Sequence, residues 1–293
     1  MTTLRLELAK EEAVRQEETL PHEMSPGIFL QVALDLEDQQ YVILLLCGFA
    51  LSSERYRRTL VQLAKDKQTL TREGDLEEKR NTLRRRLQAW IDVRNVYVPV
   101  LAVDRDSDSN QVATTKIATP ECLPLKLPSS MTPASRSTCF QGLADTECRL
   151  RLAQADDALT DLRNQLRITM GLNHYKATQV GPSQRAGTRA RGLINRFHEK
   201  TMRCANRYRA AYSALVALDP GGNWNTRLRP LGDADIRPPR KGDDEAEGTR
   251  ELSWIWRIER RSGLSGVSSR EELGPMGKEE LDDCEYVFYT LSC

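Results

Sequence analysis

The chain has 293 residues, of which 39% are hydrophobic, 6% aromatic and 29% charged, and its formal net charge is +1. This composition supports a helical core but argues against two fully packed domains, because long polar segments cannot bury enough surface to offset their chain entropy. A nearly neutral chain has no overall attraction for nucleic acid or membranes, so such a contact would have to come from a local cluster of charge.

The first part of the chain, 1–101, is predicted to be helical. Ser25 followed by Pro26 is typical of a helix start, because serine caps the free amide groups and proline fits the first helical position. Apolar residues at helical spacing then predict a helix to about Leu46. A further helix is expected after residues 52–53, and another from Asp75 to about Tyr97.

An apolar run from Tyr41 to Leu51 interrupts this pattern. Its β-branched residues, Val42 and Ile43, would also suit a strand. A membrane-spanning helix needs about 20 apolar residues, so the run is too short to be one. We therefore expect a buried helical turn or a strand here and no membrane contact.

The central segment, 143–218, carries two stripes of apolar residues at alternating steps of three and four. The first contains Cys148, Leu152, Ala155, Leu159, Leu162, Leu166 and Thr169, and the second contains Ile194, Phe197, Thr201, Cys204, Tyr208, Ala211, Leu215 and Leu218. Residues so spaced share one face of a helix. Glycine and proline between the stripes allow the chain to reverse, so we predict two antiparallel helices, Leu143 to about Ala177 and Gly187 to Leu218. Leu162 should be buried in their seam and Arg163 should lie on the surface.

The remaining segments lack apolar periodicity. A Ser/Thr/Pro-rich linker is predicted at 102–142, where Leu123, Leu125 and Leu127 permit a short extended contact. A second, Pro/Gly-rich and acidic linker is predicted at 219–249, and 250–293 is predicted to hold a short tryptophan-containing helix and a disordered tail. The predicted class is therefore all-α: an elongated helical bundle or coiled-coil-like hairpin with long disordered linkers.

A cluster of basic residues on the second hairpin helix is the candidate nucleic-acid interface. Its members are Arg189, Arg196, Lys200, Arg203 and Arg207. The last four form a stripe beside the apolar face and could contact the phosphates of duplex DNA weakly and without sequence preference. The alternative is a solvated face that pairs with Asp156, Asp157 or the acidic residues 243–247.

No catalytic residue, metal site or cofactor is predicted. Three acidic clusters occur, at residues 35–38, at 156–157 and at Asp233 with Asp235, but they lie on amphipathic helices or linkers instead of converging from strand ends. The three histidines have no cysteine or histidine at a zinc-ligand spacing, and phosphate-binding glycine loops and nucleophile motifs are absent from the sequence. We therefore expect a protein that is not an enzyme.

The seven cysteines are odd in number and form no Cys-x-x-Cys pair. This usage is typical of reduced, intracellular cysteine packed as a small hydrophobic residue. The basic groups Lys79–Arg80 and Arg84–Arg86 form a weak nuclear-import pattern, which a helix surface explains equally well.

Four stretches, taken in order, carry a family resemblance. They are Leu34–Gln40 (LDLEDQQ), Leu152–Leu166 (LAQADDAL running on to LRNQL), Thr188–Asn195 (TRARGLIN) and Leu252–Arg257 (LSWIWR). The chain resembles the C-terminal region of fungal Kyakuja–Dileera–Zisupton (KDZ) transposase-like proteins, many of which carry an upstream cysteine-cluster domain. The resemblance implies that the catalytic domain lies upstream, so no catalytic residue can be carried over.

Two departures from the family pattern lie at the apolar run after Tyr41 and in the sequence after Arg257. The resemblance therefore implies a non-catalytic helical remnant that contacts DNA through its basic helix. The alternative is a helical scaffold or oligomerisation module that associates with itself through its helices and has no nucleic-acid role.

Overall fold

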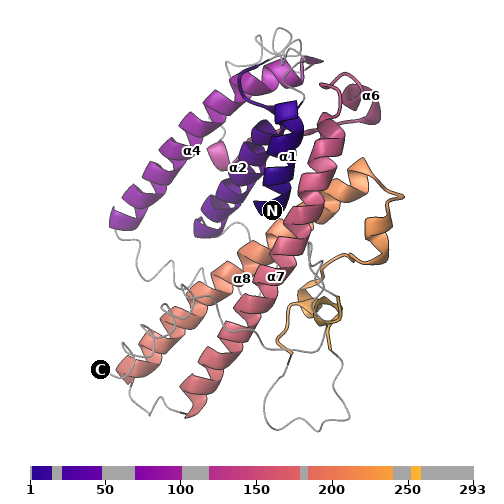
Figure 1. The fold of residues 1–293 in the computed structure, drawn as a ribbon. Helices are drawn as coiled ribbons and strands as arrows, with labels where there is room; N and C mark the ends of the chain where they lie inside the picture. Colours follow the sequence, from indigo (N-terminus) through magenta and orange to yellow (C-terminus); the bar gives the residue numbers. More distant parts are fainter. Residues whose placement is uncertain are drawn as a thin grey trace. The chain divides into compact units, whose positions relative to one another are not determined.

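A computed structural model describes residues 2–14, 22–47, 70–100, 119–178, 184–239 and 252–258. The described residues are helical and contain no strand, which confirms the all-α class (Figure 1). They belong to two compact units, Met1–Leu159 with Arg203–Asp233, and Thr160–Met202 with Ala234–Cys293. The two long helices, α7 (Leu143–Thr178) and α8 (Gln184–Leu218), each contribute to both units.

Helix α2 (Pro26–Leu46) begins where the sequence predicts. The Ser25 hydroxyl accepts a hydrogen bond from the Ile28 amide, and Pro26 occupies the first turn. The helix continues to Leu46 and is capped by Cys47, so the strand alternative for Val42 and Ile43 is wrong. Residues 48–51 of the apolar run lie outside the described residues.

Helix α4 (Leu70–Tyr97) packs on α2 and starts five residues earlier than the sequence predicts. Gly74 lies inside the helix at an open position, where glycine weakens a helix by about 1 kcal/mol relative to alanine without ending it. A further helix was expected after residues 52–53, but residues 48–69 lie outside the described residues. Helix α1 (Thr2–Val14) contributes Leu8 to the same core.

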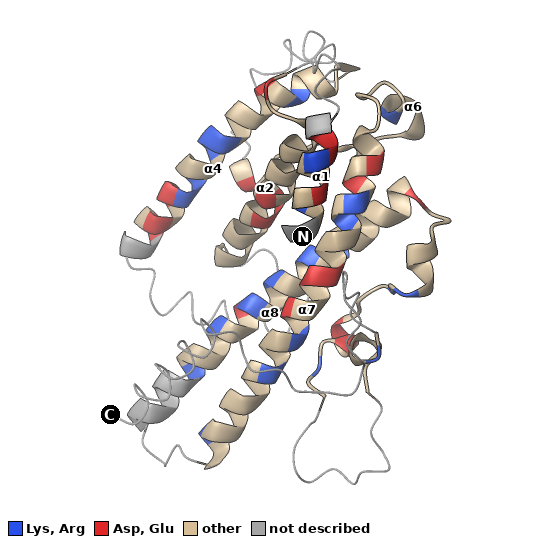
Figure 2. Cartoon of the chain, in the orientation of Figure 1, with Lys and Arg blue, Asp and Glu red and all other residues tan. Residues whose placement is uncertain are grey.

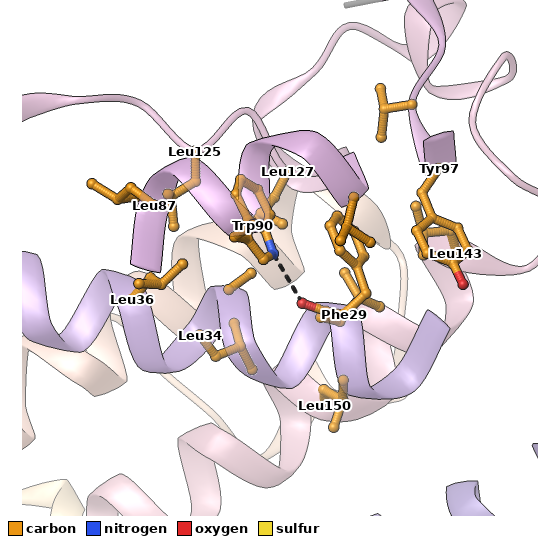
Figure 3. Packing of buried hydrophobic residues seen from close by; sticks show 14 of the residues in the cluster. Phe29, Leu34, Leu36, Leu87, Trp90, Tyr97, Leu125, Leu127, Leu143 and Leu150 are labelled. Carbon is orange, nitrogen blue, oxygen red and sulfur yellow. Dashed lines mark hydrogen bonds between the residues drawn. The ribbon is translucent and has the colours of Figure 1, made fainter. Parts of the chain in front are cut away.

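Aromatic stacking joins α2 and α4 at the centre of the first unit (Figure 3). The Phe29 ring stacks on Trp90 at 5.1 Å between centroids and on Tyr97 at 5.0 Å. The Trp90 indole nitrogen also donates a 3.1 Å hydrogen bond to the Phe29 carbonyl oxygen. The indole can therefore be buried without leaving its polar group unpaired.

Residues 119–142, predicted as part of a linker, pack against this core. They form the turns η2 (Pro120–Cys122) and η3 (Pro128–Ser130) and the short helix α6 (Pro133–Arg136). Leu125 and Leu127 are buried in the core, which confirms the extended contact. The rest of the segment is held by hydrogen bonds from distant side chains, and composition alone could not predict these.

The described part of the second predicted linker is also ordered. It contains η4 (Asn223–Thr226) and η5 (Asp233–Asp235). The Trp224 ring meets Tyr212 edge-on at 5.6 Å, and the Tyr208 hydroxyl donates a 2.6 Å hydrogen bond to the Arg229 carbonyl oxygen. Side chains of α8 thus fix residues 219–233 within the first unit.

In the second unit, α7 and α8 run antiparallel and side by side, as predicted (Figure 1). Ile168 and Leu172 of α7 pack with Phe197 of α8, and Leu162 and Leu166 are buried. The 3/4-spaced stripes therefore face the core. No described helix is apolar over a long enough stretch to cross a membrane.

Two expectations for the second unit are wrong. The predicted tryptophan-containing helix is only a 3-10 turn, η7 (Trp254–Trp256). Arg163, expected on the surface, is buried and donates hydrogen bonds of 2.6 Å to the Ile255 carbonyl oxygen and 2.9 Å to that of Ile258. The turn has too few residues to satisfy its own carbonyl groups, so a buried guanidinium satisfies them.

Both Leu162→Ala and Arg163→Ala are expected to destabilise the protein. The leucine truncation leaves a cavity and should cost about 2–5 kcal/mol. The arginine truncation removes charged donors from buried carbonyl groups, at about 1.5–3 kcal/mol. Urea unfolding would measure both, with Val216→Ala on exposed α8 surface as the control, which should change stability by about 0.5 kcal/mol or less. An Arg163→Ala midpoint equal to that of the control would contradict the buried role of Arg163.

Candidate nucleic-acid interface

The five predicted basic residues all lie in α8, but they have different surroundings. The side chain of Arg189 lies outside the described residues. Arg196 and Lys200, in the second unit, are exposed, and the Lys200 ammonium lies 4.9 Å from the centroid of the Phe197 ring. Arg191, on the same stretch of helix, is exposed as well.

Arg203 and Arg207, in the first unit, bind Asp38 of α2. The Nε atom of Arg203 donates to both carboxylate oxygens, at 3.1 and 3.0 Å, and its Nη2 also donates to Oδ2. The Nη2 atom of Arg207 donates to the same Oδ2 at 3.1 Å. One carboxylate therefore binds both arginines in the C-terminal half of the predicted basic stripe and offsets one of their two positive charges.

The Asp38 side chain is only 13% exposed, which makes its ionisation depend on these arginines. Burial raises the pKa of Asp38, but hydrogen bonds from Arg203 and the positive charges of Arg207 and Arg203 together hold it below the ordinary value of 3.8. The hydrogen bond to Asp38 in turn raises the pKa of Arg203. Asp38, Arg203 and Arg207 are thus all charged at neutral pH, and their contacts contribute to joining α2 with α8.

Acidic and basic residues lie along the same helices (Figure 2). The acidic clusters that were weighed as metal ligands are also engaged in ion pairs. Glu37 binds Arg151 with two hydrogen bonds, of 2.6 and 2.7 Å, and Asp156 binds Arg227 with two more. Asp233 accepts a 2.6 Å hydrogen bond from Arg209, while exposed Asp35 lies 3.9 Å from Arg5. Among the residues that the structure describes, no three His, Cys, Asp or Glu side chains are placed to hold a metal ion.

The structure gives Arg203 and Arg207 an acidic partner that the predicted alternative did not name. Asp156 binds Arg227 of the segment after α8, and residues 243–247 lie outside the described chain. The actual partner, Asp38, lies 165 residues before Arg203. Local charge patterns carry no signal for a pairing at that separation, although a solvated or paired face was the correct kind of alternative for Arg203 and Arg207.

Sequence reasoning also missed a buried polar network centred on Arg151, which is 2% exposed. Besides Glu37, Arg151 binds Glu147 at 3.3 Å and Gln154 at 3.1 Å. Glu147 is fully buried and accepts hydrogen bonds from the amide and hydroxyl groups of Ser129, at 2.9 and 2.6 Å. The i,i+4 spacing of Glu147 and Arg151 was a usable signal for one of these contacts, but not for the other partners.

Comparisons with known proteins give no match: no family model, no curated protein and no solved structure is similar to this chain. The fold and the contacts above are therefore the basis for a functional assignment.

Asp38→Asn is expected to lower the urea midpoint at about pH 7, and this difference from the wild type should shrink in acid. The pKa of Asp38 in the folded chain lies below 3.8, so its stabilisation is complete above the unfolded value and is lost as the pH falls through the folded value. Asp35→Asn is the matched control on the same helix, because its carboxylate is 55% exposed and only loosely paired. Equal midpoints for the two variants at neutral pH would contradict the role of Asp38.

Proposed function

We propose that the chain is a non-catalytic helical scaffold, related to the C-terminal region of KDZ transposase-like proteins. The observation that carries this proposal is the binding of Arg203 and Arg207 to Asp38. The N–H groups that these arginines donate to Asp38 are not available to a phosphate group, although the Arg203 side chain is 43% exposed. These contacts therefore favour a structural role for Arg203 and Arg207 within the first unit.

The residues that carry the family resemblance support the same proposal. In the first motif stretch, Glu37 binds Arg151, Asp38 binds Arg203, and the Gln40 amide donates to the carbonyl oxygens of Pro120 and Leu123. In the second motif stretch, Asp156 binds Arg227. Arg163, in the same stretch, binds the 3-10 turn that the fourth motif stretch forms. A set of motif residues that hold helices and turns together is what a structural region would require.

The ion pairs of the acidic clusters favour a non-catalytic role. A metal-dependent nuclease needs carboxylates that converge on one ion. Here Glu37, Asp38 and Asp156 each face an arginine, which satisfies their charge within the fold.

Non-specific DNA binding is the second candidate, and it is confined to the first half of α8. Arg191, Arg196 and Lys200 are exposed there. Exposed cations on one helix can replace counterions condensed on duplex phosphates. The set belongs to no base-reading motif and offers only positive charge to the phosphates, so the binding would be weak and independent of sequence.

Fluorescence anisotropy with a random DNA duplex at about 50 and about 200 mM salt distinguishes the two candidates. The scaffold proposal predicts no binding at low salt and self-association, measured by sedimentation, that does not change with salt. DNA binding through α8 predicts a log–log slope near −0.9 for each phosphate contacted, so about −2 to −3 for three cations.

The matched variants are Arg196→Gln with Lys200→Gln, and Arg84→Gln with Arg85→Gln on exposed α4 surface, which remove the same charge. If α8 binds DNA, the first pair should make the slope less steep by about 2 and the second pair should leave it unchanged. A steep slope in the wild type that only the first pair reduces would overturn the scaffold proposal.

A further inference from the structure

Residues 252–258 form a short segment, the tryptophan segment, that binds α7 and has little regular structure of its own. It contains the 3-10 turn η7, which is closed by backbone hydrogen bonds from Trp256 to Ser253 and from Arg257 to Trp254. So short a turn cannot hold its own conformation, because the entropy lost by fixing the backbone exceeds what these hydrogen bonds return. Its conformation therefore depends on the surface to which it binds.

Arg163 of α7 holds the backbone of the tryptophan segment. Its guanidinium donates the hydrogen bonds of 2.6 and 2.9 Å to the carbonyl oxygens of Ile255 and Ile258. The Ile255 side chain is fully buried, so it is the apolar anchor of the segment. In peptide recognition, hydrogen bonds to the main chain give affinity and buried side chains give specificity, and this contact has both.

Trp256 supplies a second anchor. The guanidinium of Arg167, one helical turn after Arg163, lies 5.3 Å from the centroid of the Trp256 ring. The indole nitrogen donates a 3.0 Å hydrogen bond to the Arg237 carbonyl oxygen. The ring face and the N–H group of the indole are thus both used. Arg163, Arg167 and the Arg237 carbonyl group together are named the α7 docking surface.

The tryptophan segment and the α7 docking surface belong to the same unit but to different parts of the chain. In the sequence, residues 240–251 separate the segment from the described residues before it. A fully extended stretch of this length spans about 40 Å at most. None of the contacts above depends on which chain that stretch belongs to, so a second copy could supply the segment equally well.

We propose that the α7 docking surface is a binding site for a short tryptophan-containing peptide, and that its partner is the tryptophan segment of a second copy of this chain. The proposal rests on the scaffold function above and names the surface and the partner of its self-association. Tryptophan and arginine are enriched among the residues that contribute most to binding at protein interfaces, and both form this contact.

Exchange of an identical segment between two copies conserves the contacts that each chain otherwise makes with itself. Its cost is the lost freedom of two separate chains, and the chain's own segment competes at a high effective concentration. Exchange therefore grows with protein concentration, and it is most complete where a chain cannot use its own segment.

Two variants of the full-length chain that complement each other test this proposal. Ile255→Asp puts a charge at a fully buried position and disables the segment, while Arg163→Ala with Arg167→Ala disables the α7 docking surface. Neither variant can dock its own segment, and only a mixture pairs an intact segment with an intact surface. Fluorescence transfer between differently labelled chains and sedimentation should show a one-to-one heterodimer in the mixture and monomers of each variant alone.

A labelled peptide of residues 250–260 supplies the matched control. It should bind the Ile255→Asp chain, and so should the same peptide with Leu252→Asp, which adds a charge at an exposed position. The peptide with Ile255→Asp should bind more weakly by about tenfold or more, because the buried anchor is lost. Circular dichroism checks the helical content of each variant. If the Ile255→Asp chain loses helix, Trp256→Ala takes its place, because it removes an anchor without burying a charge.

A mixture of the two folded variants that stays monomeric would overturn the inference. Should the wild type associate in the same experiment, the scaffold proposal would stand without this surface, and should it also stay monomeric, both proposals would fail. Association of each variant alone to the wild-type extent would likewise place the contact between copies elsewhere on the chain.

Discussion

The buried guanidinium of Arg151 is the interaction on which the first unit depends. Moving a charged group out of water costs several kcal/mol, and that cost is offset only when every donor finds an acceptor. Glu37, Glu147 and Gln154 supply these acceptors, and Glu147 also binds Ser129. The network therefore ties α2, α7 and the segment before α7 to one another, and replacing any one partner would leave a buried charge incompletely satisfied.

Several other ion pairs in the first unit join a carboxylate on one element to an arginine on another. Asp38 of α2 binds Arg203 of α8, Asp156 of α7 binds Arg227, and Glu121 of η2 binds Arg80 of α4. Exposed ion pairs contribute little to stability, but the carboxylates of these pairs are partly or largely buried, from 22% exposed in Asp156 to 3% in Glu121. Such contacts specify which helix faces which, whereas the leucine and aromatic core supplies most of the free energy of folding.

The helices could be predicted from sequence because their signals are local. The cap at Ser25 located the start of α2, and the 3/4 spacing located α7, α8 and their buried faces. The packing of residues 119–142 and the burial of Arg163 could not be predicted in this way, because both depend on partners far away in the chain. Proline- and serine-rich composition indicates that a segment lacks helical periodicity, but it does not reveal that Gln40 and Glu147 will bind its backbone.

The difference between local signals and long-range contacts also explains the outcome for the candidate nucleic-acid interface. Spacing placed four basic residues on one stripe of α8, but it could not show that two of them would bind Asp38. Asp38 competes with duplex DNA for the N–H groups of Arg203 and Arg207, although the Arg203 side chain is 43% exposed. The Asp38 side chain is only 13% exposed, so losing both arginines would leave a mostly buried carboxylate without these partners. The fold therefore competes with DNA for these two arginines, whereas Arg196 and Lys200, nearer the start of the helix, are exposed.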